Sequence, residues 1–237
     1  SLNAEMKTTV SLFFLLGSCA VIWGVLTGTF FGQGWLQPLV PQLNNPETME
    51  TFCFFLGALH LSIAHSWRAL LKFPSLTALA DVGYICILWT AFFLARTLVL
   101  GEAFPSFGIW LVATGIILVI LFTSPQARVL RGIGEGLGTV ALSFMNNITD
   151  VISYVRLFAV GLAGLAIAET VNTMASGFGT GVAALAAGIV ILIIGHGLNI
   201  ILGIISVLVH GVRLNVLEFS GHANVTWSGF TFEPLKE

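Results

Sequence analysis

Arg156 is the residue most indicative of chemistry, because it lies between Val155 and Leu157 inside a long apolar segment. An arginine deep in an apolar membrane helix costs at least about 2.5 kcal/mol, so it needs a functional or structural reason. Small and polar residues share its helical face: Asn146, Thr149, Ser153 and Ala163. This face favours a polar environment for Arg156. The alternative is that its side chain, about two turns into the helix, only extends to the aqueous boundary.

A second set of small and polar residues runs along the last apolar segment. On an ideal helix its members fall within a sector of about 80°. Glycine and serine stripes often serve helix packing alone, but packing does not explain Asn199, His210 and Arg213. Aligned polar side chains in an apolar helix favour a hydrated surface that carries protons or ions. The full stripe is Gly188, Gly195, Asn199, Gly203, Ser206, His210 and Arg213.

The other titratable residues of the apolar segments predict neither a metal site nor a hydrolase. His196 and His210 are about 21 Å apart along a helix axis, too far to bind one ion. No serine is placed with a histidine and a carboxylate as a nucleophilic triad requires. We therefore expect no cofactor. His60 and His65 are interpreted as packing or interfacial residues. Asp81 and Arg96, near opposite ends of one span, are interpreted as snorkelling or helix-contact residues.

The composition places all these residues in a membrane protein. Of the 237 residues, 57% are hydrophobic and only 8% are charged, with a mean hydropathy of +0.98. A soluble domain has about 25% charged residues. The net charge is -2, and no cluster of lysine or arginine offers a surface for nucleic acid.

The apolar segments predict an all-α, polytopic integral membrane bundle with about six spans, of which the last two are long and tilted. A bilayer core of about 30 Å needs roughly 20 helical residues. The segments lack the ten-residue alternation of a membrane barrel. The expected spans are residues 10–31, 49–71, 76–100, 104–123, 148–174 and 181–212.

We expect residues 1–237 to form a single membrane domain with four parts. These are a four-helix peripheral part (1–123), a cytoplasmic connection (124–147), an ion-path helix hairpin (148–219) and a cytoplasmic tail (220–237). The connection has alternate glycines but lacks the lysine of a phosphate-binding loop, which favours a flexible or interfacial hinge.

The basic residues predict the orientation, because they occupy every second connection. By the positive-inside rule those connections, and both termini, are cytoplasmic. The compact loops are typical of a bacterial or archaeal plasma membrane. The basic residues used are Lys7, Arg68, Lys72, Arg128, Arg131, Arg213 and Lys236.

Two motifs near the end of the chain carry a family resemblance. The segment from Asp150 to Gly164, DVISYVRLFAVGLAG, resembles the penultimate membrane helix of the stator subunit, called a or I, of V/A-type rotary ATPases. The sequences GHGLN, from Gly195, and HGVRLNVLEF, from His210, are similar to its final helix with a second arginine. Residues 23–32, 56–65 and 232–234 also resemble this family. The family's long N-terminal cytoplasmic arm, and one first membrane helix, have no counterpart, so we expect a fragment.

The resemblance implies a role for each motif. In this family the membrane domain embraces a rotor ring of proteolipid c/K subunits, each with a carboxylate, and supplies two offset half-channels. Arg156 would separate the half-channels and Arg213 would support it. Many relatives have a histidine where this chain has Gly164, which argues against a histidine shuttle there. The candidate half-channel residues are Ser153, Asn146, Asn199, Ser206, His210, Glu169 and Glu218.

The geometry of ideal helices sets two conditions on these roles. Glu169 points about 140° away from Arg156, which assigns it to a half-channel rather than to the surface that faces the rotor. In a straight hairpin that turns near Gly177, Arg156 would face Leu198 and not Arg213. The two helices must therefore be tilted or offset for both arginines to cooperate.

The resemblance also implies the partners and the activity. The chain would be a non-catalytic membrane subunit of a proton- or sodium-translocating ATPase or synthase, not an enzyme by itself. Its partners would be the rotor ring, other stator and central-stalk subunits and membrane lipid. Two alternatives stay open: a stand-alone secondary transporter, and a structural membrane scaffold.

Overall fold

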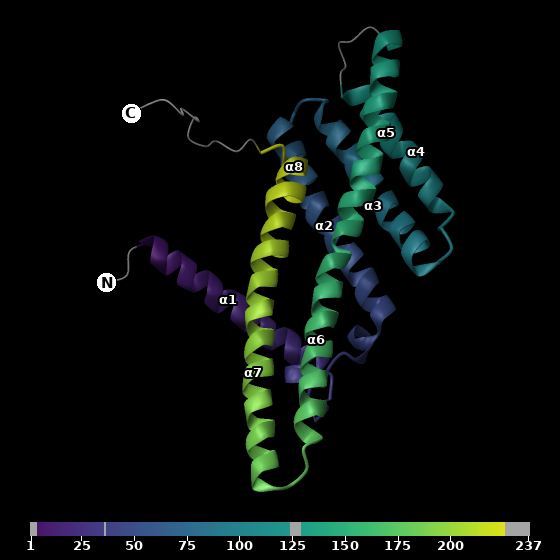
Figure 1. Cartoon of the computed structure of the whole chain (residues 1–237). Coiled ribbons are helices and arrows are strands. Elements are labelled where there is room, and N and C mark those ends of the chain that lie inside the picture. The colour runs from purple at the N-terminus through teal and green to yellow at the C-terminus, as the bar shows by residue number, and fades with distance from the viewer. Residues whose placement is uncertain (1–3, 36, 124–128, 226–237) are drawn as a thin grey trace, which may run out of the picture. The chain divides into compact units, whose positions relative to one another are not determined.

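The computed structural model describes residues 4–35, 37–123 and 129–225, and every regular element in these residues is helical (Figure 1). The predicted all-α class is therefore confirmed. Residues 232–234 and Lys236, used above, lie outside the described residues, as do residues 124–128 of the expected connection. The elements are α1 (Ala4–Thr27), η1 (Phe30–Gly32), η2 (Pro41–Asn44), α2 (Pro46–Lys72), α3 (Ala78–Leu100), α4 (Phe107–Phe122), α5 (Val129–Ser153), α6 (Val155–Ser176), α7 (Val182–Ser206), the π-helical η3 (Val207–Gly211) and η4 (Leu214–Phe219), and α8 (Ser220–Ala223).

Four of the helical stretches are long and apolar enough to cross a membrane. They are Met6–Thr27, Ala78–Leu100, Ala141–Ser176 and Val182–Ala223. Helix α4 is apolar but shorter, and α2 has the length of a span with a more polar sequence. These lengths support an integral membrane protein.

The penultimate predicted span begins too late. It was expected at residue 148, whereas α5 already begins at Val129 and includes the glycine-rich segment that was interpreted as a hinge. Alternate glycines lower helix propensity, but the apolar residues between them have helical periodicity, which keeps the segment helical. The four-part division of the chain, with its cytoplasmic connection and tail, stays a prediction.

The chain divides into two compact units. Unit 1 comprises Ser1–Glu50 and Arg156–Leu208, and unit 2 comprises Thr51–Val155 and Val209–Glu237. Each unit therefore joins segments that are far apart in the sequence.

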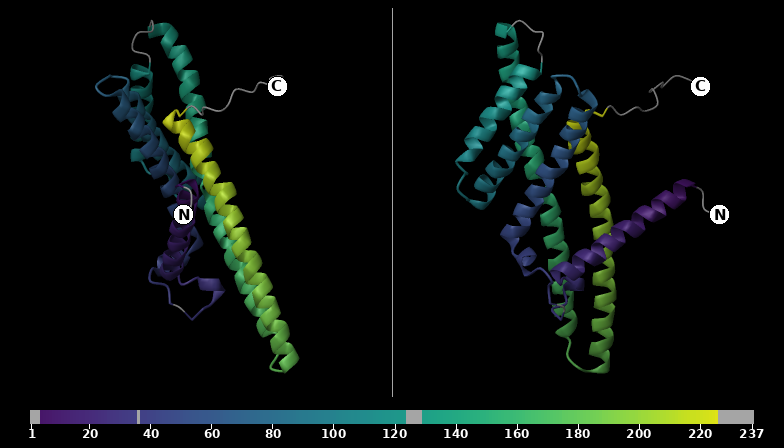
Figure 2. Two further views of the ribbon diagram at one scale, coloured as in Figure 1. Left: turned by 90° about the vertical axis from the view of Figure 1, so that its left-hand side faces the viewer. Right: turned by 180° about the vertical axis from the view of Figure 1, so that it is seen from behind.

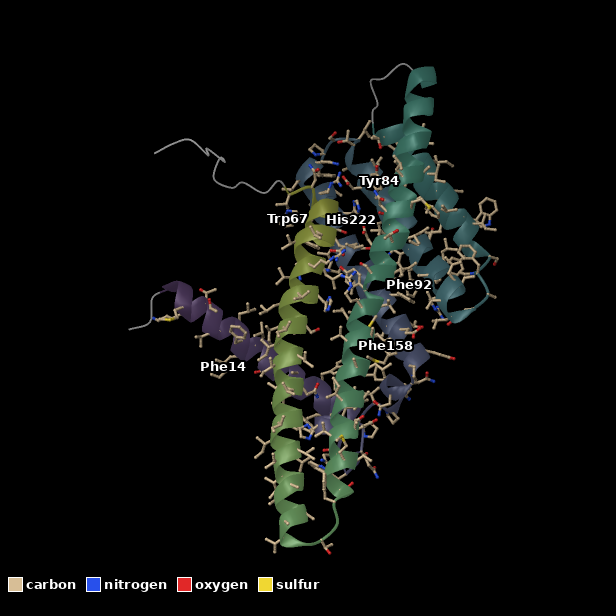
Figure 3. The ribbon with its side chains drawn as sticks, in the orientation of Figure 1. Phe14, Trp67, Tyr84, Phe92, Phe158 and His222 are labelled. Atoms are coloured by element: carbon tan, nitrogen blue, oxygen red, sulfur yellow. The ribbon has the colours of Figure 1, made fainter. Side chains whose placement is uncertain are left out.

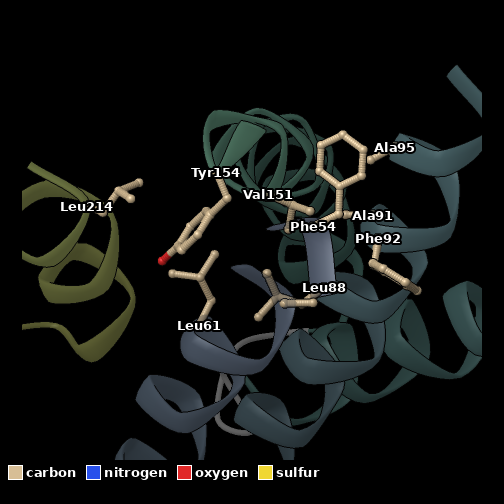
Figure 4. Packing of buried hydrophobic residues seen from close by; sticks show 10 residues of the cluster. Phe54, Leu61, Leu88, Ala91, Phe92, Ala95, Val151, Tyr154 and Leu214 are labelled. Atoms are coloured by element: carbon tan, nitrogen blue, oxygen red, sulfur yellow. The ribbon is translucent and has the colours of Figure 1, made fainter. Parts of the chain in front are cut away.

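Unit 2 has a continuous buried core. Side chains from α2, α3, α5 and the last helical stretch interdigitate there, as Figure 4 shows for Phe54, Leu88, Val151 and Leu214. Glycines allow α3 and α4 to approach closely, because a Cβ atom on Gly83 would lie only 2.9 Å from the carbonyl oxygen of Gly115. Small residues at helix crossings are the usual means of close packing in membranes.

Unit 1 is built around the antiparallel pair α6 and α7, which run side by side in Figures 1 and 2. They are in close contact at Gly188, where a Cβ atom would lie 3.1 Å from the carbonyl oxygen of Ala175. The segment after α1 belongs to the same unit, and the backbone of Val40 donates a hydrogen bond to Leu26 (3.0 Å).

Candidate functional site

Arg156 is the second residue of α6, just after the break at Tyr154 that separates α6 from α5. Its side chain is half-buried. Within the described residues, its Nη1 atom is buried and has no hydrogen-bond partner. A buried guanidinium nitrogen without an acceptor is costly, so this atom has an unmet need for a polar or acidic partner.

The α6–α7 pair is offset from a straight hairpin that turns at Gly177. A straight hairpin turning at Gly177 would place Gly164 opposite Val190. In the structure the Gly164 carbonyl instead accepts a hydrogen bond from Asn199 Nδ2 (3.0 Å), nine residues further along α7. Asn199 is therefore a polar contact between these helices, and Gly164 contributes its backbone carbonyl to it.

A second polar contact in unit 1 involves His196, which the sequence analysis set aside. Its Nε2 lies 3.0 Å from Asn172 Oδ1, and Asn172 Nδ2 donates to the carbonyl oxygen of Phe31 (2.7 Å). The His196 ring also packs edge-on against Phe31, with centroids 5.2 Å apart. These contacts fix the turn after α1 on the α6–α7 pair.

Glu169 lies beside this turn, and its side chain is exposed. Gly32 has a φ of +66°, and a Cβ atom there would lie only 2.9 Å from the Glu169 backbone nitrogen. Only glycine meets both conditions without strain. The segment from Trp23 to Gly32, one part of the family resemblance, is therefore shaped to pack against α6 near Glu169.

Unit 2 brings together three of the predicted site residues. Glu218 is buried, and its Oε1 lies 3.9 Å from Arg213 Nε and 3.4 Å from Ser153 Oγ. The Ser153 hydroxyl lies closer to the carbonyl oxygen of Asp150, at 2.8 Å. No partner in the described part of the chain reaches Glu218 Oε2, which is buried. This carboxylate is thus a candidate group for an ion path.

The helix around Arg213 is not α-helical throughout. His210 lies in η3 and Glu218 in η4, two π-helical stretches that flank Arg213. A π-helix winds more slowly than 100° per residue, so the predicted stripe has its assumed geometry only as far as Ser206. π-helical turns are frequent at functional sites, which agrees with the roles expected of these residues.

The remaining candidates are less informative. The described structure gives no hydrogen bond or ion pair to the side chains of Asn146, Ser206 or His210. Asn146 is exposed, whereas its neighbour Asn147, which the sequence analysis did not select, is buried and has an unpartnered Nδ2 atom. The role of Asn146 in a half-channel stays a prediction.

Sequence reasoning also missed a cluster around Asp81. This carboxylate is fully buried, so the snorkelling interpretation is wrong for it and the helix-contact alternative is confirmed. It contacts Lys72 Nζ (2.6 Å), Arg68 Nε (3.3 Å) and His65 Nδ1 (3.4 Å). The only sequence signal was that α2 ends with basic residues shortly before Asp81, which lies in the first turn of α3.

Comparisons with known proteins place these features in a family. The chain is 33% identical to V-type ATP synthase subunit I of Borreliella burgdorferi, over 95% of this chain and 41% of that protein. It is 34% identical to V-type ATP synthase subunit I 1 of Treponema pallidum, over 99% of this chain and 41% of the relative. It is also 26% identical to A-type ATP synthase subunit I of Methanocaldococcus jannaschii, over 81% of the chain and 28% of that protein.

No family model and no solved structure matches the chain. The chain spans about two-fifths of the length of the first two relatives, 41% in each case.

The fold and the site together define a polytopic helical membrane protein with charged and polar residues on its long apolar helices. The chain belongs to the family of subunit I, also called a, of V/A-type rotary ATPases. These relatives are named as subunits of V-type and A-type ATP synthases.

Proposed function

We propose that this chain is the ion-translocating stator of a V/A-type rotary ATPase, with two proton half-channels separated by Arg156. The observations that carry the proposal are that the Arg156 side chain is only half-buried and that its Nη1 has no hydrogen-bond partner among the described residues. A desolvated cation is stabilised by a close opposite charge, and the carboxylate of a passing rotor ring would supply one intermittently.

The arginine would act by favouring the ionised form of that rotor carboxylate. The carboxyl group then releases its proton into one half-channel before it receives another from the second half-channel. Guanidinium keeps its charge when desolvated, whereas a lysine can lose its proton, so the residue type suits the role. ATP chemistry belongs to other subunits in this proposal.

The polar contacts of each unit support an assignment of the half-channel residues. Ser153 and Glu218, with Arg213 as the supporting arginine, would serve the cytoplasmic side, because the nearby basic residues Arg68 and Lys72 predict that side. Glu169, beside the turn after α1, would serve the opposite side. Both termini are then cytoplasmic. The remaining candidate lining residues are Asn146, Asn199, Ser206 and His210.

The proposal implies three kinds of partner. Small residues on α6 would allow the helices of a c/K rotor ring to approach closely. Other stator and central-stalk subunits would hold the chain against rotation, and lipid would cover the remaining apolar surface.

The test replaces Arg156 with alanine in the complete ATPase complex, reconstituted in sealed vesicles. ATP-driven ion uptake should fall to the background of uncoupled vesicles while the rotor ring remains bound, since only the separating charge is removed. Arg96→Ala is the matched control, because Arg96 also lies in an apolar helix and has a buried nitrogen, Nε, without a partner among the described residues, but it is paired with Glu102 in the same chain. Its uptake should stay near that of the unmodified complex.

Two results would contradict the proposal. Normal uptake by the Arg156→Ala complex would favour a structural scaffold. Ion transport by this chain without the rotor ring would favour a stand-alone secondary transporter.

A further inference from the structure

A continuous chain of hydrogen bonds links four titratable side chains of unit 2, and neither the family resemblance nor the proposed function uses it. His65 Nδ1 lies 3.4 Å from Asp81 Oδ1, and His65 Nε2 lies 2.9 Å from His222 Nδ1. His222 Nε2 in turn lies 2.9 Å from Asp150 Oδ2. We call Asp81, His65, His222 and Asp150 the histidine chain. Its members come from α3, α2, α8 and α5, and His222 is labelled in Figure 3.

The number of protons on this chain follows from its geometry. A carboxylate only accepts hydrogen bonds, so the nitrogen that faces Asp81 and the nitrogen that faces Asp150 must each bear a proton. The contact between the two rings needs one more proton, on either nitrogen. All three contacts therefore need three N–H groups, whereas two neutral imidazoles have two. With all three contacts made, the histidine chain therefore has room for one proton more than two neutral imidazoles carry.

The surroundings hold this proton loosely. Arg68 and Lys72 contact Asp81, so these two cations already balance the two carboxylates of the histidine chain. Arg68 also donates to the backbone oxygen of His222 (3.0 Å), and the Tyr84 ring stacks on His65 with centroids 5.2 Å apart. The site therefore has fixed geometry without the surplus negative charge that would trap a proton.

The histidine chain also runs from the interior of unit 2 to a more exposed end. The side chains of Asp81, His65, His222 and Asp150 are 0%, 3%, 10% and 28% exposed. Asp150 is thus the end that can exchange protons with water. Among the residues that the structure describes, no group of three or more possible ligands is arranged to hold a metal ion. The arrangement suits a proton better than a metal.

We propose that the histidine chain is a one-proton reservoir that supplies the cytoplasmic half-channel, an inference that rests on the proposed stator function. A proton that arrives on the Asp150 carboxyl group passes to the bare Nε2 of His222, which restores the carboxylate and forms the third N–H. Loss of a proton from the same nitrogen reverses the step. Only O–H and N–H bonds form and break, and no electron is transferred.

The test uses the complete complex in vesicles whose cytoplasmic face points outward. His65→Gln and His222→Gln keep a side chain that can form hydrogen bonds but cannot hold the excess proton. The initial rate of ATP-driven proton uptake is measured between about pH 6 and about pH 8 outside, where imidazole protonation changes. We expect each variant to be at least about threefold slower at the upper pH and close to the unmodified complex at the lower pH, where water supplies protons directly.

His60→Gln is the matched control. His60 lies on α2 as His65 does, but its ring stacks on Phe219 and its Nδ1 lies 2.8 Å from the Tyr154 hydroxyl, outside the histidine chain. The rate of proton uptake by the His60→Gln complex should equal that of the unmodified complex at every pH. If His65→Gln or His222→Gln prevents assembly, Asp150→Asn tests the same end of the chain, because its amide oxygen can still accept from His222.

Three outcomes would overturn the reservoir. They are unchanged uptake in both glutamine variants, a loss that is equal at every pH, and the same pH-dependent loss in His60→Gln. The Arg156→Ala complex separates this proposal from the stator function. If that variant abolishes uptake while the glutamine variants behave as the unmodified complex, only the reservoir fails. If it pumps normally, the stator function fails.

Discussion

The two units place buried charge in opposite situations. In unit 2, Asp81 is fully buried and has three partners within the chain. In unit 1, the described residues give Arg156 Nη1 no partner. Within α6 and α7, the buried residues are Ala168 and Gly188 alone. Unit 2 pairs Asp81, its most deeply buried charge, internally, although Glu218 Oε2 and Arg96 Nε also have no partner among the described residues. The α6–α7 pair of unit 1 is largely exposed and presents a polar and apolar surface to another molecule. This contrast assigns internal stability to unit 2 and the contact with a partner to unit 1.

The largest effect on stability is expected from Asp81→Asn in unit 2. The change leaves two cations without their carboxylate, and breaking a buried ion pair costs about 3 to 5 kcal/mol. We expect about 3 kcal/mol, the lower end of this range, because Lys72 and Arg68 are partly exposed and can reach water. The measurement is the temperature at which the detergent-solubilised subunit aggregates.

Glu102→Gln is the control for this prediction. Glu102 is 42% exposed and pairs with Arg96 near the end of α3, so its loss should cost less than about 1 kcal/mol. Equal losses in the two variants would contradict the view that unit 2 depends on its buried charges.

A smaller loss of stability is expected from Gly32→Ala in unit 1. The new side chain would adopt a left-handed φ of +66° and would lie 2.9 Å from the backbone nitrogen of Glu169. Strain of this kind costs about 1 to 3 kcal/mol, and we expect about 2 kcal/mol from strain and close contact together. Limited proteolysis of the turn after α1 would report its release from α6.

Gly101→Ala separates the two causes. Gly101 has a similar φ of +70°, but a Cβ atom there would meet nothing within 4 Å. Gly101→Ala should therefore lower stability only by the backbone strain, about 1 kcal/mol. If Gly32→Ala were no more costly than Gly101→Ala, the turn would not depend on its contact with α6.

The sequence predicts the features that follow from local pattern. Helix α3 was expected at residues 76–100 and is found at Ala78–Leu100, because a continuous apolar run determines both its type and its length. The motifs around Arg156 and Arg213 identified the family through local residue order. Both kinds of feature depend on neighbouring residues alone.

The features that the sequence does not predict depend on distant contacts. His65 and His222 are 157 residues apart, and no periodicity indicates that their rings meet. The π-helical stretches around Arg213 likewise change the facing of His210 through backbone geometry that composition does not reveal. Helix α5 extends through a glycine-rich segment that local propensity assigns to a hinge.

The smallest effect on stability, and the sharpest test of the contrast between the units, is expected from Gly161→Leu on α6. A Cβ atom at Gly161 would meet nothing within 4 Å, so the isolated subunit should change by less than about 0.5 kcal/mol. If α6 faces a rotor ring, the added side chain should nevertheless weaken ring binding and lower ATP-driven uptake. Gly83→Leu is the comparison, because a Cβ atom there already lies 2.9 Å from Gly115 and the substitution should destabilise the isolated subunit itself. A Gly161→Leu complex with normal uptake and normal ring binding would show that this face of α6 contacts lipid, which would remove the main difference between unit 1 and unit 2.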